Sequence, residues 1–385
     1  MWGKKAKIAS LCSLLVLALS SCSGSAQTTS PSLEGVKYAL YFSPPSLFLN
    51  DFSVFTPNHG YVLLIDEEGG HQAIKTDGMD GGEVIWGSAH ELSFADQSHN
   101  YIVGEQKIEK FEAPKTDLQN DIAVSNGTYL STFNLGGKRG EYKNQFTLTD
   151  AHGNHLETIT ESIETIATCP DGKMIGGGKN RGPTLDLEEN TSSQILISQV
   201  FDGQNLSVKP LWNHTASEWR STSLYGLVCT TNNFYALMYS PDNENISDIS
   251  LVSVDISSGE SEIKPLISDE TYTSTIYTMG PDLYNSRYLD WFTPDYFYRT
   301  DILTGETHRL LNLEGYDGGR KVSQNEVEVD EDFIYQLVEL PGDGDQYAIH
   351  TYARSDGALV DQLELDPIKG VGGMGQYGFA VRPSP

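Results

Sequence analysis

A short turn recurs along the chain and constrains the fold more than any other sequence feature. Each copy has an aspartate followed closely by a glycine, with an apolar or aromatic strand pattern before it and a second strand pattern after it. Aspartate accepts local backbone hydrogen bonds and glycine permits a positive φ, so each copy predicts a tight hairpin. The copies begin at Asp66, Asp150, Asp202, Asp255, Asp301 and Asp356.

The spacing of these turns predicts a β-propeller. The intervals are 84, 52, 53, 46 and 55 residues, and the first is long enough to hide a decayed copy near Gly104. A repeat of this length with four short strands per unit is typical of propeller blades. One unit divides into strands at 121–125, 128–135, 144–149 and 155–160. Further units are expected at about 83–112, 163–213, 222–267, 271–314 and 322–366.

These six units leave strand patterns at both ends of the domain. Residues 368–382 offer two strands and residues 60–76 offer two more. Joining them would close a seventh four-stranded blade and leave no open sheet edge. Six or eight blades, a β-sandwich or two β domains are the alternatives, although the regular turn disfavours the last two. The sequence therefore predicts an all-β chain with a single seven-bladed propeller over residues 36–385.

The first 21 residues have the pattern of a signal peptide. Three lysines precede an apolar run over residues 8–19, which is too short to span a membrane comfortably. The run ends in Leu19-Ser20-Ser21-Cys22. This tetrapeptide resembles the lipobox of bacterial lipoproteins, and the resemblance implies that Cys22 is acylated and begins the mature chain. The alternative is an ordinary secretory signal with a chance cysteine.

The lipobox resemblance also implies a location. Residues 22–35 comprise the lipidated cysteine and a Ser/Thr/Gly/Pro-rich segment, which predicts a flexible tether. The protein is therefore expected in the cell envelope, on the extracytoplasmic side of a bacterial membrane, and held there by its lipid.

One turn carries a second resemblance. The segment Asp301-Ile-Leu-Thr-Gly-Glu306 is similar to repeats of quinoprotein-like and YVTN-type propellers. Quinoprotein blades end in a docking tryptophan, and these blades do not. The resemblance therefore implies a propeller fold, and no cofactor is expected.

Two cysteines remain in the mature domain once Cys12 leaves with the signal and Cys22 takes lipid. Cys169 and Cys229 both end a predicted inner strand, and the two strands belong to consecutive blades. Equivalent inner strands approach each other near the channel, and an extracytoplasmic location permits oxidation. We therefore predict a Cys169–Cys229 disulfide, with two buried free thiols as the alternative.

The charge of the chain excludes one class of function. The sequence has 25 Lys+Arg and 53 Asp+Glu, for a net charge of -28, which becomes -31 when the three signal lysines are removed. A nucleic-acid binder needs a basic surface to meet phosphate, so no nucleic acid is expected as a partner. Such acidity keeps the exported domain soluble and repelled from anionic lipid.

The few basic residues are unevenly distributed. Seven of the 22 in the mature chain lie in or beside three glycine-rich loops. Glycine lets a backbone approach a ligand closely, and Lys and Arg supply charged donors, so these loops could bind a carboxylate- or phosphate-bearing ligand. Ordinary solvent-facing turns are the alternative reading. The candidate ligand-binding residues are Lys138, Arg139, Lys179, Arg181, Arg320 and Lys321.

Searches for catalytic or metal-binding motifs assign no residue. The letters Gly370-Val-Gly-Gly-Met-Gly375 match a dinucleotide fingerprint, but no helix can follow so near the end of the sequence given. His152 and His155 share one predicted turn without a third ligand. Asp343 and Asp345 lack the rest of a calcium-loop pattern. These positions are interpreted as loop, strand and turn residues.

The sequence favours a non-enzymatic binding or scaffold propeller. We expect a monomer that is anchored to the membrane through its lipid and offers its loop face to a protein, a peptide or a cell-envelope polymer. The alternative is a propeller enzyme, a glycan hydrolase or lyase with its site at the channel mouth. For that alternative, Asp80, Glu83 and His90 are the best placed residues.

Overall fold

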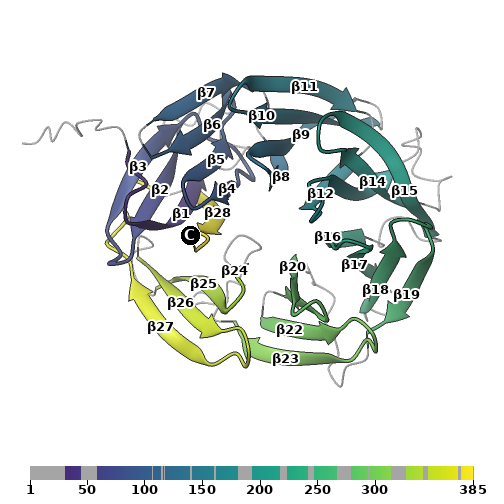
Figure 1. Ribbon diagram of the computed structural model, residues 1–385. Helices are drawn as coiled ribbons and strands as arrows, with labels where there is room; N and C mark the ends of the chain where they lie inside the picture. Colours follow the sequence, from purple (N-terminus) through teal and green to yellow (C-terminus); the bar gives the residue numbers. More distant parts are fainter. Residues whose placement is uncertain are drawn as a thin grey trace, which may run out of the picture.

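A computed structural model describes residues 31–44, 59–105, 107–113, 116, 118–138, 141–159, 162–180, 193–216, 223–241, 247–266, 279–293, 295–313, 327–340, 346–371 and 374–384, with only the backbone in parts of some strands. These residues form seven four-stranded antiparallel sheets arranged as a ring (Figure 1). The prediction of an all-β, seven-bladed propeller is confirmed. The described residues contain no helix, and hence none that is long and apolar enough to cross a membrane.

Each blade is numbered here in chain order and its strands run from the channel outward. Blade 1 contains β4 (Val84–Ser88), β5 (Glu91–Ala95), β6 (His99–Gly104) and β7 (Ile108–Glu112). Blade 2 contains β8 (Gln119–Ser125), β9 (Thr128–Lys138), β10 (Glu141–Asp150) and β11 (Gly153–Ile159). Blade 3 contains β12 (Ser162–Thr168), β13 (Met174–Asn180), β14 (Ser193–Phe201) and β15 (Leu206–Ala216).

The next three blades follow the same pattern. Blade 4 contains β16 (Ser223–Cys229), β17 (Asn233–Pro241), β18 (Ser247–Asp255) and β19 (Ser261–Pro265). Blade 5 contains β20 (Met279–Tyr284), β21 (Tyr288–Phe292), β22 (Tyr296–Asp301) and β23 (Thr307–Asn312). Blade 6 contains β24 (Val327–Val329), β25 (Phe333–Glu339), β26 (Tyr347–Ala353) and β27 (Leu359–Glu364).

Blade 7 closes the ring with strands from both ends of the domain. It contains β28 (Gly375–Val381), β1 (Val36–Ser43), β2 (Gly60–Asp66) and β3 (His71–Thr76). The predicted division into two strands from each end is wrong, because one strand comes from the C-terminal side and three from the N-terminal side. The sequence VKYALYFS of β1 is almost wholly buried between β28 and β2. The glycine-rich stretch before β28 forms the connection into that strand.

The recurring Asp–Gly turn joins the third and fourth strands of its blade. In blade 4, Asp255 Oδ1 accepts hydrogen bonds from the backbone N–H groups of Ser257 and Ser258 at 2.9 and 2.7 Å, and Gly259 has a φ of +72°. Glycine adopts that conformation without strain, which explains why the pair recurs. The decayed copy lies where expected, between β6 and β7 of blade 1.

The hydrophobic core lies between neighbouring blades. One apolar cluster joins blades 6 and 7, and another joins blades 3 and 4. A further cluster joins blades 7 and 1 and includes Leu33, which is fully buried. Leu33 falls within the segment expected to be a tether, so the packed domain begins before residue 36. An apolar side chain at this position fills a gap between two blades, which composition alone did not reveal.

Candidate functional site

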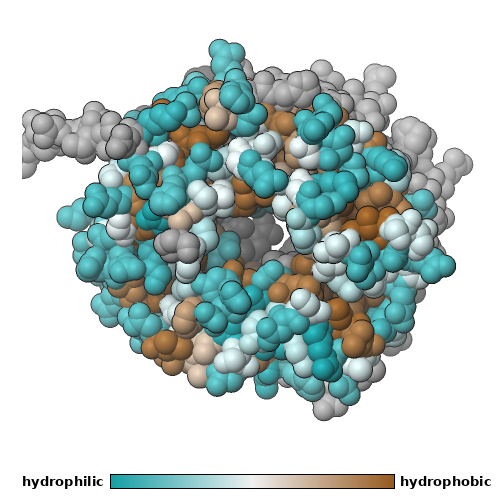
Figure 2. Space-filling view, in the orientation of Figure 1, coloured by the Kyte–Doolittle hydropathy of each residue, from teal (hydrophilic) through white to brown (hydrophobic). Residues whose placement is uncertain are grey.

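The first strands of the seven blades surround a central channel. Each of these inner strands contacts the next one around the ring, including β28 with β4 and with β24. The space-filling view shows the face of the ring hollowed at its axis (Figure 2). All inner strands run in the same direction, so one face of the ring holds their beginnings. We call this end of the channel the channel mouth, and the opposite face, with the turns from first to second strands, the turn face.

Two carboxyl groups form a pair at the channel mouth. Glu83 lies directly before β4, and Asp121 is the third residue of β8. The two side chains share a hydrogen bond. Burial raises the pKa of Asp121 to about 6, although two backbone donors oppose that rise. Burial also raises the pKa of Glu83 well above its usual range, and the nearby Asp121 charge raises it further. The pair therefore holds a proton at pH values where isolated carboxyls are ionised.

The backbone around this pair is tightly held. Asp121 Oδ1 accepts a hydrogen bond from Ile122 N at 2.7 Å, and its Oδ2 accepts one from Ile166 N of β12 at 2.6 Å. Asp121 thereby bridges blades 2 and 3. Glu83 N donates to Gln119 Oε1 at 3.2 Å, and Gln119 is 2% exposed. Within the described part of the chain, Gln119 Nε2 has no hydrogen-bond partner.

Two further acids lie on inner strands elsewhere around the channel, nearer the turn face. Burial raises the pKa of Glu328, in β24 of blade 6, to about 8, and the neighbouring Asp282 contributes repulsion. Glu328 in turn raises the pKa of Glu83, although blade 7 separates their blades. Burial also raises the pKa of Asp282 in β20, while Arg354 opposes that rise through an Nη1–Oδ2 contact of 2.9 Å.

Asp282 is joined to a buried ionic network through Arg354. Asp290 of β21 is 1% exposed and accepts hydrogen bonds from Arg299 Nε and Nη2 at 2.7 and 2.8 Å. Arg354 Nε donates to Asp290 Oδ2 at 2.8 Å, which links blade 6 to blade 5. The Arg299 guanidinium also lies 3.9 Å from the centre of the Tyr284 ring. Paired and hydrogen-bonded charges of this kind are the form in which ions are tolerated inside proteins.

The acidic mouth suits a ligand that brings positive charge or hydrogen-bond donors. Glu83, Asp121, Asp282 and Glu328 come from four blades, with the first two at the channel mouth and the last two nearer the turn face. A concave site lined by one sign of charge concentrates the field and attracts the opposite charge. Because these carboxyls ionise only as the pH approaches their raised pKa values, such attraction should grow with pH.

One group of described residues has the composition of a metal site. Asp77, Asp96 and His99 place one ligand atom each within 4.8 Å of one another. However, Asp96 already accepts four hydrogen bonds, from Asp77 N, Ser98 N, His99 N and the Tyr101 hydroxyl. Its lone pairs are fully used in holding the loops beside β5. We therefore interpret this group as structural.

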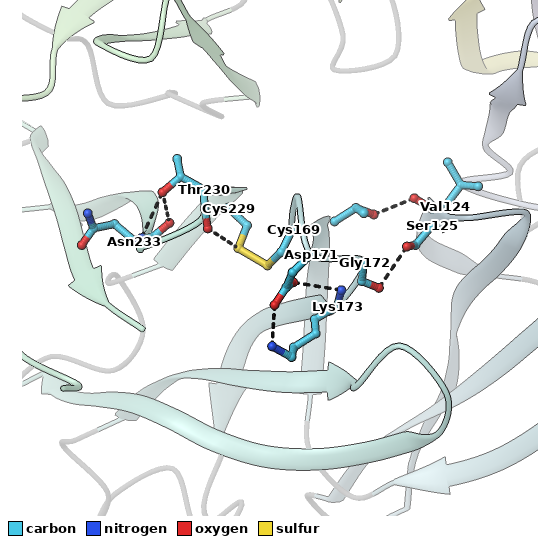
Figure 3. The surroundings of a disulfide bond; sticks show 10 residues. Val124, Ser125, Cys169, Asp171, Gly172, Lys173, Cys229, Thr230 and Asn233 are labelled. Atoms are coloured by element: carbon cyan, nitrogen blue, oxygen red, sulfur yellow. Dashed lines mark hydrogen bonds and ion pairs between the residues drawn. A yellow bond between two sulfur atoms is a disulfide. The ribbon is translucent and has the colours of Figure 1, made fainter. Parts of the chain in front are cut away.

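The predicted disulfide is present. Cys169 follows β12, Cys229 ends β16, and their Cα atoms are 4.7 Å apart (Figure 3). The bond joins the inner strands of blades 3 and 4 at the turn face. Next to it, Ser125 Oγ donates to Gly172 O at 2.9 Å and Thr168 Oγ1 donates to Val124 O at 2.8 Å, which ties blade 2 to blade 3 (Figure 3).

The other predicted site residues divide into two groups. His90 and Glu83 lie at opposite ends of β4, and exposed His90 pairs with Glu105 at 2.7 Å on the turn face. Asp80 lies at the channel mouth, where it hydrogen-bonds Tyr377. His152 N donates a hydrogen bond to Asp150 Oδ1 in an exposed turn, as expected for a turn residue. The remaining predicted residues lie outside the described residues or side chains: Cys22, Lys138, Arg139, His155, Lys179, Arg181, Arg320, Lys321, Asp343 and Asp345.

Several residues of the site were missed by sequence reasoning. Asp121, Asp282 and Glu328 were not singled out among 53 acidic residues. A sequence pattern could have identified them. Each of these acids, like Glu83, is followed directly by an aliphatic residue of a first strand. Comparing the blades position by position would have placed these acids on the inner strands around the channel. The partners Asp290, Arg299 and Arg354 carry no such repeat signal.

The comparisons with known proteins agree with this architecture. Residues 32–378 match the YycP β-propeller domain, so the chain belongs to that family of propellers. No curated protein matches the sequence.

Two solved structures resemble the chain at low identity. A hypothetical selenium-binding protein from Sulfolobus tokodaii is 10% identical, with a TM-score of 0.50 over 92% of this chain and 95% of that one. A puromycin-hydrolysing peptidase of Mycobacterium tuberculosis is 11% identical, with a TM-score of 0.48 over 86% of this chain and 54% of that one. These likenesses concern the fold alone.

Proposed function

We propose that the chain is an exported, lipid-anchored lipoprotein whose propeller binds a ligand at the channel mouth. The ligand would be a protein, a peptide or a cell-envelope polymer that presents positively charged groups. The carboxyl groups of Glu83, Asp121, Asp282 and Glu328 carry this proposal, because four blades contribute them to the inner strands around the channel.

The cysteines support the extracytoplasmic part of the proposal. A disulfide between Cys169 and Cys229 forms and persists where the environment is oxidising. The signal and lipobox pattern ending at Cys22 supplies the route to such a compartment and the point of attachment. Two acyl chains or more would anchor the protein stably.

The anionic ligand suggested by the basic loops is the weaker candidate. The described side chains of Glu83 and Asp121 make the channel mouth acidic. A site that repels carboxylates at its centre would have to bind an anion at its rim alone.

The geometry of the acid pair also favours binding over glycan hydrolysis. Glycosidases separate their two carboxyl groups by about 5 Å or more, so that a sugar carbon or a water fits between them. Glu83 and Asp121 instead share a hydrogen bond, which leaves no such space. The pair is better suited to sharing a proton and to receiving a donor from a ligand.

The anchor is tested by metabolic labelling with a palmitate analogue. We expect the wild type to be labelled and to sediment with membranes, and Cys22→Ser to lose both properties. Cys12→Ser is the matched control, because the same substitution ten residues earlier should leave both properties unchanged. Membrane sedimentation of Cys22→Ser without label would contradict the lipoprotein assignment.

Ligand charge is tested with two peptides of equal length, one rich in lysine and one rich in glutamate. We expect the intact lipoprotein in detergent to bind the lysine peptide in fluorescence anisotropy, and more tightly at pH 8 than at pH 5. Asp121→Asn should weaken that binding, whereas Glu331→Gln, an exposed acid on the turn face, should not. Preferential binding of the glutamate peptide would refute the acidic mouth as the site and support the basic loops.

A further inference from the structure

The N-terminal segment of the domain is fixed at one particular place on the ring. Arg382, which directly follows β28, donates from Nη1 to Leu33 O at 2.7 Å and to Val36 O at 2.9 Å. Its Nε donates to Ala89 O, in the turn between β4 and β5, at 2.5 Å. One guanidinium thus joins the start of the domain to blade 7 and blade 1.

Apolar and polar contacts strengthen this attachment. Leu33 is fully buried in the cluster that joins blades 7 and 1, where it lies with Trp86. The Arg382 guanidinium lies 5.4 Å from the centre of the Trp86 ring. One residue earlier, Ser32 N and O exchange hydrogen bonds with the side-chain amide of Gln72. We call Ser32, Leu33, Gln72 and Arg382 the N-terminal clamp.

The clamp lies on the turn face. β28 ends just before Arg382, and Ala89 belongs to a turn between a first and a second strand. Glu83 and Asp121 lie toward the opposite end of the inner strands, near their beginnings. An inner strand of seven residues such as β28 is about 20 Å long, so the clamp and the acidic mouth are separated by the thickness of the ring.

The distance to the lipid is short. Nine residues lie between Cys22 and Ser32, so ten Cα-to-Cα steps join them. A chain of ten residues spans at most about 35 Å when fully extended, and about 17 Å on average as a flexible coil. A propeller held at its turn face by so short a chain has that face nearer the bilayer.

We propose that the N-terminal clamp orients the anchored propeller, with the turn face toward the membrane and the acidic channel mouth away from it. This inference rests on the lipid anchor of the proposed function and adds a direction to it. The ligand then reaches the mouth from the envelope side, and the lipid surface cannot occupy the site. The clamp is a positioning device and takes no part in ligand contact.

The orientation is tested by fluorescence quenching in vesicles. The intact lipoprotein is reconstituted into phosphatidylethanolamine–phosphatidylglycerol vesicles that carry a headgroup-attached quencher. A single fluorophore is placed by Glu331→Cys on the turn face or by Lys369→Cys in the connection into β28, at the mouth; both residues are exposed. The other cysteines of the mature chain are protected by the acylation expected at Cys22 and by the Cys169–Cys229 bond.

We expect severalfold stronger quenching at position 331 than at position 369. Arg382→Ala should bring the two values together, whereas Arg287→Ala should not, because Arg287 pairs with Asp301 in blade 5 and does not touch the clamp. A Gly/Ser insertion of about twenty residues before Pro31 should also bring them together, since reach grows with the square root of length. The insertion leaves every folded residue unchanged and covers the case in which Arg382→Ala unfolds.

The outcomes separate this inference from the proposed function. Equal quenching at the two positions in the anchored wild type, or stronger quenching at position 369, would overturn the orientation while the anchor stands. A protein that does not associate with vesicles at all would refute the anchor and, with it, the orientation. A difference that survives the insertion would show that something other than the clamp and its short tether sets the orientation.

Discussion

The junction between blades 3 and 4 and the junction between blades 5 and 6 are held by different chemistry. At the first, Cys169 and Cys229 join two inner strands covalently amid an apolar cluster. At the second, Asp290 of blade 5 is buried against Arg299 of its own blade and Arg354 of blade 6. The covalent bond constrains the chain even when the protein is unfolded, whereas the ionic network stabilises only the folded state. The two junctions should therefore fail under different conditions.

The ionic junction should give the largest loss of stability when one partner is removed. Asp290→Asn keeps the shape of the side chain but leaves Arg299 and Arg354 buried without their shared counter-ion. Removing one partner from a buried ion pair typically costs about 3–5 kcal/mol. We expect a loss of that size in the free energy of unfolding from urea denaturation.

A companion substitution tests the cause. Replacing Asp290, Arg299 and Arg354 together with apolar residues of similar volume should recover part of the loss, because no arginine is then buried without its counter-ion. If Asp290→Asn costs less than about 1 kcal/mol, the network is hydrated in solution and the junction is held by packing alone.

The covalent junction should give the next largest effect. The disulfide closes a loop across a sequence separation of 60 residues. Bonds that close loops of this kind typically stabilise by about 2–4 kcal/mol, chiefly by restricting the unfolded chain. We expect the double substitution Cys169→Ala, Cys229→Ala to lower the free energy of unfolding by that amount. A reductant should destabilise the wild type similarly and leave the double variant unaffected.

The carboxyl group of Glu328 should make stability depend on pH. Glu328 has an ordinary pKa of 4.5 in the unfolded chain and a pKa of about 8 in the folded protein. Between these values the unfolded state loses its proton and the folded state keeps it, so stability falls as the pH rises from about 5 to 8. Each pKa unit of difference between the two states corresponds to about 1.4 kcal/mol of unfolding free energy. The contribution of Glu328 is smaller than this because its side chain is partly exposed.

Glu328→Gln should remove this contribution. The variant and the wild type should have similar stability near pH 5, and the variant should be more stable by at least about 1 kcal/mol near pH 8. Glu331→Gln, three residues along and exposed, is the control and should leave the pH profile unchanged. A wild-type profile that is flat between pH 5 and 8 would contradict the raised pKa of Glu328.

The two junctions also show what the sequence can and cannot predict. The disulfide could be predicted because the repeat placed Cys169 and Cys229 in equivalent positions on consecutive inner strands. The same repeat predicted seven blades, since turn spacing is a local property of the chain. The ionic junction could not be predicted, because Asp290 and Arg354 are 64 residues apart and occupy different strand positions.

The acidic mouth lies between these cases. The repeat could have aligned Asp121 with Glu83 and Glu328 with Asp282. However, the raised pKa values come from burial and, for Glu83 and Glu328, from the charge of neighbouring acids. Those causes exist only once the ring has closed. Leu33 is a case in which the sequence prediction was wrong. Its segment has the composition of a tether, but its side chain fills a gap between blades.

The smallest predicted effect sharpens the contrast between buried and exposed ion pairs within blade 5. Arg287 Nε and Nη2 both contact Asp301 Oδ2, at 2.9 and 2.6 Å, which resembles the contact of Arg299 with Asp290. However, the Arg287 side chain is 54% exposed, whereas that of Arg299 is 11% exposed. Water already solvates the exposed guanidinium, so Arg287→Ala should change the free energy of unfolding by about 0–1 kcal/mol. A loss as large as that of Asp290→Asn, measured in the same urea titration, would show that geometry and not burial sets the strength of these pairs.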